Sequence, residues 1–461
     1  MIRVALFSAL SHTIFVVVGL LVYVLTTRIG HQRRPPSSAI GWVIGIVAFP
    51  YIAVPLFLVL GSRKFKRPER HLRSAIEPPP GGGPVWVTQL LASMELPGPA
   101  HNEMLVWHDD GPEALQRLLA LVDGAQQRLD LSTFIFGNDE VGDAVVEALI
   151  RCTQRGVRVR LLIDAIGSVK TRAGTLRRLR AHGVRVRRFM PLLHNPRQGR
   201  LNLRNHRKVV VADGWHVWSG GRNLAVEYFC DRPDAPAWLD LTHEARGDLA
   251  VEAAAQFDLD WRTASGRRRG VSGPPPYTPV ISEGPCAQWV ASGPDHADDT
   301  VHALLLAAAY HAQQRILAVT PYFVPDDALL YAWCMASRRG VDVNVLVPAR
   351  SNHLLADWAR GRALRELCAS GGKVWLLPQM AHAKAVVVDD DLALSGSLNL
   401  DGRSLFLNYE VMTAFYSTEQ VQWLVGWFER QIATATPFNA RQPGLLRDMG
   451  EGLVRSVGFQ L

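Results

Sequence analysis

One short pattern of reactive residues occurs twice in this chain. Its first copy, spaced His-x-Lys-x4-Asp, is formed by His206, Lys208 and Asp213. The second copy has the same spacing and is formed by His382, Lys384 and Asp389. Six residues later, each copy reaches two small residues, one further residue and an asparagine, Asn223 or Asn399. A single copy would be a weak signal, but two copies with equal internal spacing are hard to obtain by chance.

These residue types suit the transfer of a phosphoryl group. Each copy leads into a β-branched run typical of a strand, where the histidine and lysine of one copy would share a face about 6–7 Å apart. A neutral imidazole can act as a nucleophile, and a second imidazole can move protons to and from the alcohols. The lysines, with Asn223 and Asn399, would hold the nonbridging oxygens. Asp213 and Asp389 suit a loop-fixing role as well as a catalytic one. This chemistry requires no metal and no cofactor.

The repeat extends to the predicted secondary structure around the motif. In the first half, strands are predicted at 129–136 and 157–164, each preceded by a helix. In the second half, the same succession gives strands at 316–323 and 341–347. The pattern predicts an α/β fold with two mixed-sheet halves, 101–265 and 286–461, related by a pseudo-two-fold axis that carries the site. Clusters of proline, glycine and arginine place linkers at 74–100 and 266–285.

Positive charge is concentrated in the N-terminal segment. The chain carries 50 Lys and Arg against 42 Asp and Glu, a net charge of +8. Residues 1–73 hold ten basic residues and one acid, so the remainder has 40 basic and 41 acidic residues, a net charge of −1. Enzymes of nucleic acids more often carry basic charge near their site, so no nucleic-acid partner is expected. The five cysteines show no C-x-x-C spacing, which indicates neither a disulfide framework nor a zinc site.

Two apolar runs in residues 1–73 predict a transmembrane hairpin. The runs cover about 4–26 and 39–60, and each is long enough to cross a hydrocarbon core of about 30 Å. Basic residues are more numerous outside the hairpin than in its turn, which predicts cytoplasmic ends and a cytoplasmic body. The basic juxtamembrane segment that follows the second run would contact anionic headgroups.

The duplicated motif resembles that of the phospholipase D superfamily, and within it the chain is similar to bacterial cardiolipin synthases. Additional similarity lies in the stretches 291–295, 320–326, 397–404 and 408–410 and in the two N-terminal runs. The resemblance implies a duplicated phospholipase D-like fold and a multi-pass protein of the bacterial inner membrane. It also implies a phosphohistidine intermediate, with His206 as the nucleophile and His382 as the acid and base. The implied reaction makes cardiolipin from two phosphatidylglycerol molecules and releases glycerol. Nothing in the sequence indicates the oligomeric state.

Each catalytic histidine should have a carboxylate that fixes its tautomer. The resemblance implies Glu410 as the partner of His382. For His206 we predict Asp240, with Glu227 as the alternative. The surrounding stretch is similar to the family's Trp-x-Asp-x-His, but Thr242 stands in the position of that histidine, and His243 follows it.

Three other functions use some of the same features. A phospholipase D would give water the place of the acceptor alcohol, and sequence separates this poorly from a synthase because the difference lies in water exclusion. A phosphodiesterase acting on nucleic acid is disfavoured by the near-neutral body. A membrane scaffold without activity is disfavoured by the two complete motifs.

Overall fold

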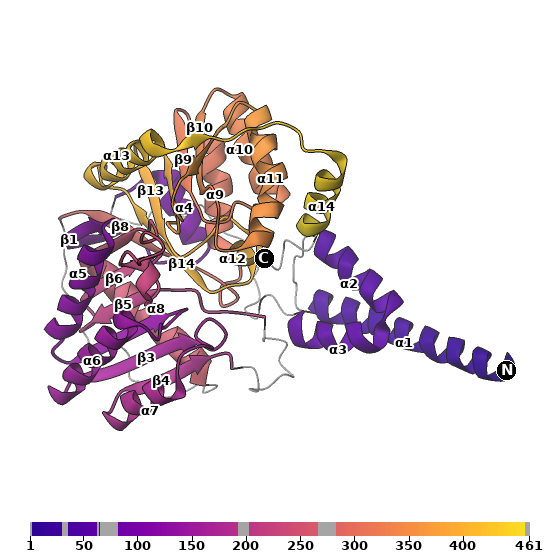
Figure 1. The fold of residues 1–461 in the computed structure, drawn as a ribbon, viewed down its shortest axis with the longest axis horizontal. Helices are drawn as coiled ribbons and strands as arrows, with labels where there is room; N and C mark the ends of the chain where they lie inside the picture. Colours follow the sequence, from indigo (N-terminus) through magenta and orange to yellow (C-terminus); the bar gives the residue numbers. More distant parts are fainter. Residues whose placement is uncertain are drawn as a thin grey trace.

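The computed structural model describes residues 2–29, 36–61, 64, 82–191, 202–265 and 283–456. Its body is an α/β structure with one mixed sheet of 15 strands and helices on both faces (Figure 1). The predicted α/β fold with a duplicated mixed sheet is confirmed. The sequence predicted a separate sheet for each half, whereas the two halves share one continuous sheet.

The first half runs from the first strand to the helix before the second linker. Its elements are β1 (Ala100–His108), α5 (Gly111–Gly124), β2 (Arg128–Thr133), α6 (Glu140–Gln154), β3 (Arg158–Asp164), α7 (Ala173–Ala181), β4 (Arg185–Phe189), β5 (Val209–Ala212), β6 (His216–Gly220), η2 (Val226–Tyr228), β7 (Thr242–Gly247) and α8 (Asp248–Ser265).

The second half repeats this succession with additions at its end. Its elements are β8 (Cys286–Ser292), α9 (Thr300–His311), β9 (Arg315–Val319), α10 (Asp327–Arg338), β10 (Asp342–Pro348), α11 (Leu354–Ala369), β11 (Lys373–Leu377), β12 (Ala385–Val388), β13 (Leu392–Gly396), α12 (Gly402–Phe406), β14 (Glu410–Phe415), α13 (Thr418–Thr434), β15 (Thr436–Pro437) and α14 (Leu445–Ser456).

The strand order shows the two-fold relation directly. It reads β15-β11-β10-β9-β12-β13-β14-β8-β1-β7-β6-β5-β2-β3-β4, so corresponding strands lie at mirrored places on either side of β8 and β1. These two central strands pair antiparallel through Ala100 with Ala287 and His101 with Cys286. In each half, a parallel β–α–β succession forms the outer part and antiparallel strands form the inner part.

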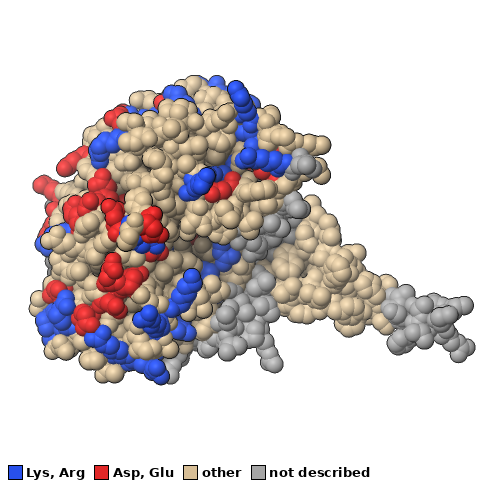
Figure 2. Space-filling view, in the orientation of Figure 1, with Lys and Arg blue, Asp and Glu red and all other residues tan. Residues whose placement is uncertain are grey.

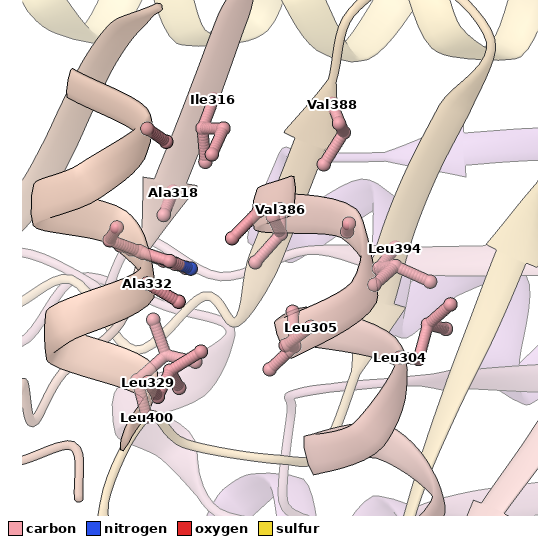
Figure 3. Packing of buried hydrophobic residues seen from close by; sticks show 14 of the residues in the cluster. Leu304, Leu305, Ile316, Ala318, Leu329, Ala332, Val386, Val388, Leu394 and Leu400 are labelled. Carbon is pink, nitrogen blue, oxygen red and sulfur yellow. The ribbon is translucent and has the colours of Figure 1, made fainter. Parts of the chain in front are cut away.

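The core consists of helices packed on the apolar faces of this sheet. In the second half, Leu304 and Leu305 of α9 and Leu329 of α10 cover one face (Figure 3). They pack over strand residues that include Ile316 of β9 and Val386 of β12. The equivalent helices α5 and α6 cover the same face in the first half. β5 and β12 are buried along their whole length, as expected for β-branched runs in the middle of a sheet.

The N-terminal segment differs from the predicted hairpin. Helix α1 (Ile2–Ile29) contains an apolar stretch, Leu10–Thr27, long enough to cross a membrane. The predicted second span is two short helices, α2 (Pro36–Ala48) and α3 (Pro50–Leu60), of 13 and 11 residues. At 1.5 Å per residue neither reaches across a core of about 30 Å. Pro50 ends α2 because it lacks an N–H and its ring clashes with a helical carbonyl, so a multi-pass anchor is not supported.

Part of the predicted first linker is folded. Helix α4 (Val85–Ser93) lies within 74–100 and buries Val87 and Leu91 against the core of the second half. Trp86 of the same helix stacks on His311 at 4.4 Å between ring centroids. Most of the basic juxtamembrane segment, residues 74–81 of the first linker and residues 266–282 of the second lie outside the described residues.

Candidate active site

Both motif histidines lie beyond the carboxyl ends of parallel strands, and we call this part of the body the histidine-bearing edge. Ser132 of β2 pairs with Val209, and Val319 of β9 pairs with Ala385, so each His-x-Lys segment lies beyond the carboxyl end of its neighbouring strand. Both histidines and both lysines are buried. The strand register thus fixes the place of each motif in its own half, and contacts between the halves bring the two motifs together.

Each histidine segment is bound to a segment from the opposite half. Asn205 forms a parallel bridge with Tyr409, and Leu239 forms one with Ala381. The N–H of His206 donates to the Tyr409 carbonyl at 2.9 Å. The N–H of His382 donates to the Leu239 carbonyl at 2.7 Å. The site is therefore built across the pseudo-two-fold axis rather than within either half.

This crossing determines which carboxylate meets which histidine. Glu410 follows Tyr409, and its Oε1 lies 3.0 Å from His206 Nδ1. Asp240 follows Leu239, and its Oδ2 lies 2.7 Å from His382 Nδ1. The predicted assignment of Asp240 to His206 and Glu410 to His382 is wrong, because the partners are exchanged between halves.

Glu410 and Asp240 occupy equivalent positions in the two halves. Gly396 pairs with Met412 and Gly220 pairs with Thr242, and each carboxylate lies two residues before the paired residue. The alternative residue Glu227 does not take this role, because the carboxylate at His206 Nδ1 is that of Glu410.

The carboxylates determine the histidine tautomers. An ionised carboxylate only accepts hydrogen bonds, so the proton must lie on Nδ1, which leaves the lone pair of Nε2 available. Burial, reinforced by Lys384, lowers the pKa of His382 to about 3, and burial also lowers the pKa of His206. Burial opposes ionisation of Asp240, but His382 and Lys384 outweigh it and lower its pKa to about 2. We assign neutral imidazoles beside ionised carboxylates.

Burial disfavours the charged form of both lysines. Burial lowers the pKa of Lys384 to about 8, although Asp240 and Glu410 oppose the shift. Burial lowers the pKa of Lys208 well below its ordinary value. The Nζ of Lys208 donates to the His206 carbonyl at 2.7 Å, and Lys384 contacts the His382 carbonyl in the same way. Two buried lysines therefore lie close to both histidines, where a bound anion would favour their charged forms.

The two asparagines lie in different local surroundings. The Oδ1 of Asn223 accepts from the N–H of Ile135 at 3.1 Å, and its Nδ2 donates to the Tyr228 hydroxyl at 2.9 Å. The Tyr228 ring lies edge-on to His382 at 4.9 Å. The Oδ1 of Asn399 is buried without a hydrogen-bond partner among the described residues. Asn399 therefore has hydrogen-bonding capacity that a ligand could use.

The motif aspartates are not in the site. Asp213 accepts the backbone N–H groups of Gln126, Gln127 and Arg128 at 2.7–2.9 Å. Asp389 accepts those of the equivalent residues 313–315 at 2.8–3.0 Å. Each follows its strand at the end away from the histidine and has a positive φ, 54° and 49°. Of the two roles that the sequence left open for these aspartates, the contacts favour the loop-fixing role.

Two supporting residues were not predicted. Ser397 Oγ donates to the carboxylate of Glu410 and accepts from the N–H of Val411 at 3.0 Å. At the equivalent place in the first half, a Cβ on Gly221 would lie 2.1 Å from Asp240 Oδ1. The small pair that follows each motif thus leaves room for, or binds, the orienting carboxylate. The sequence showed the small residues but not what they face.

The departure at Thr242 leaves the site intact. Thr242 Oγ1 accepts from the buried guanidinium of Arg222 at 2.9 Å, which also donates to the carbonyl of His108. His243 points to the other face of the strand, where its Nε2 lies 3.0 Å from Thr413 Oγ1. Burial lowers the pKa of His243 to about 3, consistent with a neutral core residue.

The described residues contain no group of three or more His, Cys, Asp or Glu side chains arranged to hold a metal ion. The fold and the site together define a phosphoryl-transfer enzyme in which two similar α/β halves each contribute a histidine and a lysine.

Comparison with known proteins identifies the family. The model of the family "Cardiolipin synthase, PLD-like domain" matches residues 118–261 and 305–432. Cardiolipin synthase A of Klebsiella pneumoniae is 30% identical over 421 residues, which cover 85% of this chain and 86% of that protein. Cardiolipin synthase A of Escherichia coli is 29% identical over 425 residues, with 86% of each chain covered. The chain belongs to the cardiolipin synthase family of the phospholipase D superfamily.

A solved structure shows the same fold. The phosphatidylserine synthase of Haemophilus influenzae has a TM-score of 0.61 with 15% sequence identity. The similarity covers 81% of this chain and all of that one.

Proposed function

We propose that the protein is a cardiolipin synthase that transfers the phosphatidyl group of one phosphatidylglycerol molecule to a second and releases glycerol. The observation that carries this proposal is the pair of buried histidines, each bound at Nδ1 by a carboxylate from the opposite half. The similarity to proteins named cardiolipin synthase A supports cardiolipin as the product.

In the first step, Nε2 of His206 attacks the phosphorus of phosphatidylglycerol. The bond between phosphorus and the glycerol oxygen breaks, and His382 gives a proton to the leaving glycerol. His382 is neutral without substrate, so it must first gain that proton. The phosphodiester anion next to it favours the charged imidazolium and thus raises its pKa in the complex.

In the second step, a hydroxyl of the second phosphatidylglycerol gives its proton to His382 and attacks the phosphorus. The bond between phosphorus and His206 breaks, which releases cardiolipin and restores the enzyme. Lys208 and Lys384 neutralise the charge that gathers on the nonbridging oxygens.

We also propose that α1 anchors the protein in the bacterial inner membrane. Of the ten basic residues in 1–73, only Arg3 precedes the apolar stretch of α1, and nine follow it. Because cytoplasmic flanks are rich in Lys and Arg, this asymmetry favours a cytoplasmic body. The basic segment would then lie at the anionic inner surface of the bilayer.

Product analysis tests the proposed reaction. Purified full-length protein in detergent is incubated with phosphatidylglycerol alone, and lipids and glycerol are measured by mass spectrometry. Cardiolipin and glycerol in equal amounts are expected, with neither formed by the His206→Ala variant. Phosphatidic acid with glycerol, and no cardiolipin, would show that the protein is a hydrolase and not a synthase. A parallel incubation that includes phosphatidylethanolamine shows whether ethanolamine is also a leaving group.

A further inference from the structure

Exposed apolar side chains gather around the histidine-bearing edge of the sheet. Isolated apolar residues on a surface are ordinary, but here they occupy equivalent loops in both halves. In the first half the loop follows β3, and in the second half it follows β10. We call these the β3 loop (165–172) and the β10 loop (349–358, including the first turn of α11).

The β3 loop exposes Ile166 and Val169, and Val169 is 66% exposed. The loop is fixed next to the site, because Ser168 Oγ donates to the Phe134 carbonyl at 2.8 Å and accepts from the N–H of Phe136 at 3.1 Å. The Phe134 ring lies edge-on to His206 at 4.9 Å. The exposed apolar residues are thus one layer of side chains away from the nucleophile.

The β10 loop repeats this arrangement in the second half. Leu354 is 77% exposed, and Leu355 and Trp358 are about half exposed. The loop is bound to Tyr322, a residue that follows β9, and the Tyr322 hydroxyl donates to Asn352 Oδ1 at 2.6 Å. The Tyr322 ring also lies 6.0 Å from the ring of His353.

Helix α14 extends this apolar surface. It is fixed on α11 by the buried pair of Arg365 and Glu451, 2.6 Å apart. A Cβ on Gly450 would lie 3.1 Å from the Trp358 ring, so the two helices are in close contact there. Leu445 and Met449 remain exposed. The amphipathic C-terminal helix is therefore docked on the body and still offers apolar side chains.

A separate contact connects the N-terminal segment to the same edge. Lys64 lies just after α3, and its Nζ donates to the carbonyls of Gly293 and Asp298 at 2.8 and 2.9 Å. The same group lies 2.9 Å from Asp299 Oδ1. The loop that it contacts follows Ser292, which pairs with Glu410 in the sheet. The chain that leads from the apolar helices thus attaches next to the orienting carboxylate.

Charge on this side also suits a lipid surface. Lys170, Arg172 and Arg350 are exposed in or beside the two loops. In Figure 2, acidic side chains are concentrated on the side of the body away from the N-terminal helices. Basic groups beside exposed apolar groups match the headgroup and acyl regions of an anionic bilayer.

We propose that the histidine-bearing edge faces the bilayer, with the β3 and β10 loops inserted into its interface and Lys64 holding the body in that orientation. The inference deepens the proposed function and rests on it for the lipid nature of the substrate. A phosphatidylglycerol molecule could then enter the site from the interface without leaving the bilayer.

The test compares two forms of one substrate with the full-length protein. Val169→Asp, Leu354→Asp and the double variant are assayed on phosphatidylglycerol vesicles and on dihexanoyl phosphatidylglycerol below its micelle-forming concentration. The double variant should lose at least about tenfold on vesicles and stay within about twofold on the monomeric lipid. Tyr310→Asp is the matched control, because Tyr310 is exposed at the opposite edge, at the end of α9. It should change neither rate. Equal losses on both substrates, or no loss on vesicles, would overturn the proposal.

A labelling experiment separates this inference from the proposed reaction. The wild-type protein is placed in vesicles of phosphatidylglycerol that contain a phosphatidylcholine with a diazirine on its acyl chain, and the labelled peptides are identified after illumination. Peptides with Val169 and Leu354 should carry label, and the peptide with Tyr310 should not. Label confined to α1 would contradict the membrane-facing edge, whatever products the enzyme makes.

Discussion

Because the orienting carboxylates are exchanged between halves, each carboxylate variant should have the same kinetic defect as the variant of the histidine that it contacts. Glu410→Gln should impair His206, the proposed nucleophile, and Asp240→Asn should impair His382, the proposed acid and base. Both substitutions keep the side-chain volume and remove the charge. A charge-assisted hydrogen bond contributes about 1.5–3 kcal/mol, so each rate should fall by about 10- to 150-fold. The loss could reach about 10⁴-fold if the new NH₂ group favours the wrong tautomer.

The assay uses two donors that differ in their leaving group. Phosphatidylglycerol needs a proton on its leaving alcohol, whereas a phosphatidyl p-nitrophenol ester does not. The burst of nitrophenol then reports the first step alone. Asp240→Asn and His382→Ala should be slow with phosphatidylglycerol and recover at least about tenfold with the activated donor. Glu410→Gln and His206→Ala should be equally slow with both donors.

The four variants together distinguish crossed from uncrossed carboxylates. If Glu410→Gln follows the profile of His382→Ala, the carboxylates serve histidines of their own half and the crossed geometry is wrong. That conclusion holds whichever histidine is the nucleophile, because each carboxylate variant is matched to a histidine variant.

Three further predictions concern the lysine, the motif aspartates and the small pair. The pKa of Lys384 is lowered to about 8, so its charged form is lost as pH rises through that value. We therefore expect kcat/KM to fall above about pH 8. The Lys384→Arg variant should move this fall to higher pH. Asp213→Ala or Asp389→Ala should lower the free energy of unfolding by about 1–3 kcal/mol, as measured by urea denaturation in detergent. The kcat of the folded variant should stay within about twofold of the wild-type value. A large loss of kcat without a loss of stability would show that these aspartates have a catalytic role. Gly221→Ala should displace Asp240 and reproduce the two-donor profile of Asp240→Asn; wild-type rates would show that the carboxylate tolerates a Cβ.

The repeated sequence predicted the main features of the body. Equal spacing in two segments implies equal local structure, and β-branched runs next to helices imply an α/β layer arrangement. The joining of the halves into one sheet depends on a short pairing at Ala100 and Ala287, which leaves no pattern in the sequence. The break between α2 and α3 was visible as Pro50, because proline interrupts a helix that hydropathy alone would continue.

The partners within the site were harder to predict. The candidate phosphate-binding residues come from the motif itself, but the orienting carboxylates come from 204 positions away for His206 and 142 for His382. Period and spacing describe one segment and not the way two halves interlock. The loop-fixing role of Asp213 likewise depends on three backbone N–H groups more than 80 positions away.

In the proposed reaction, the phosphatidyl group passes through a covalent bond to His206. The most direct test of this step is mass spectrometry of the His382→Ala variant after brief reaction with the activated donor and an alkaline quench, in which phosphohistidine is stable. We expect one phosphatidyl group on the peptide that contains His206 and none in the His206→Ala protein. An adduct on the His382 peptide of a His206→Ala protein, or no adduct on His206 despite a nitrophenol burst, would contradict it.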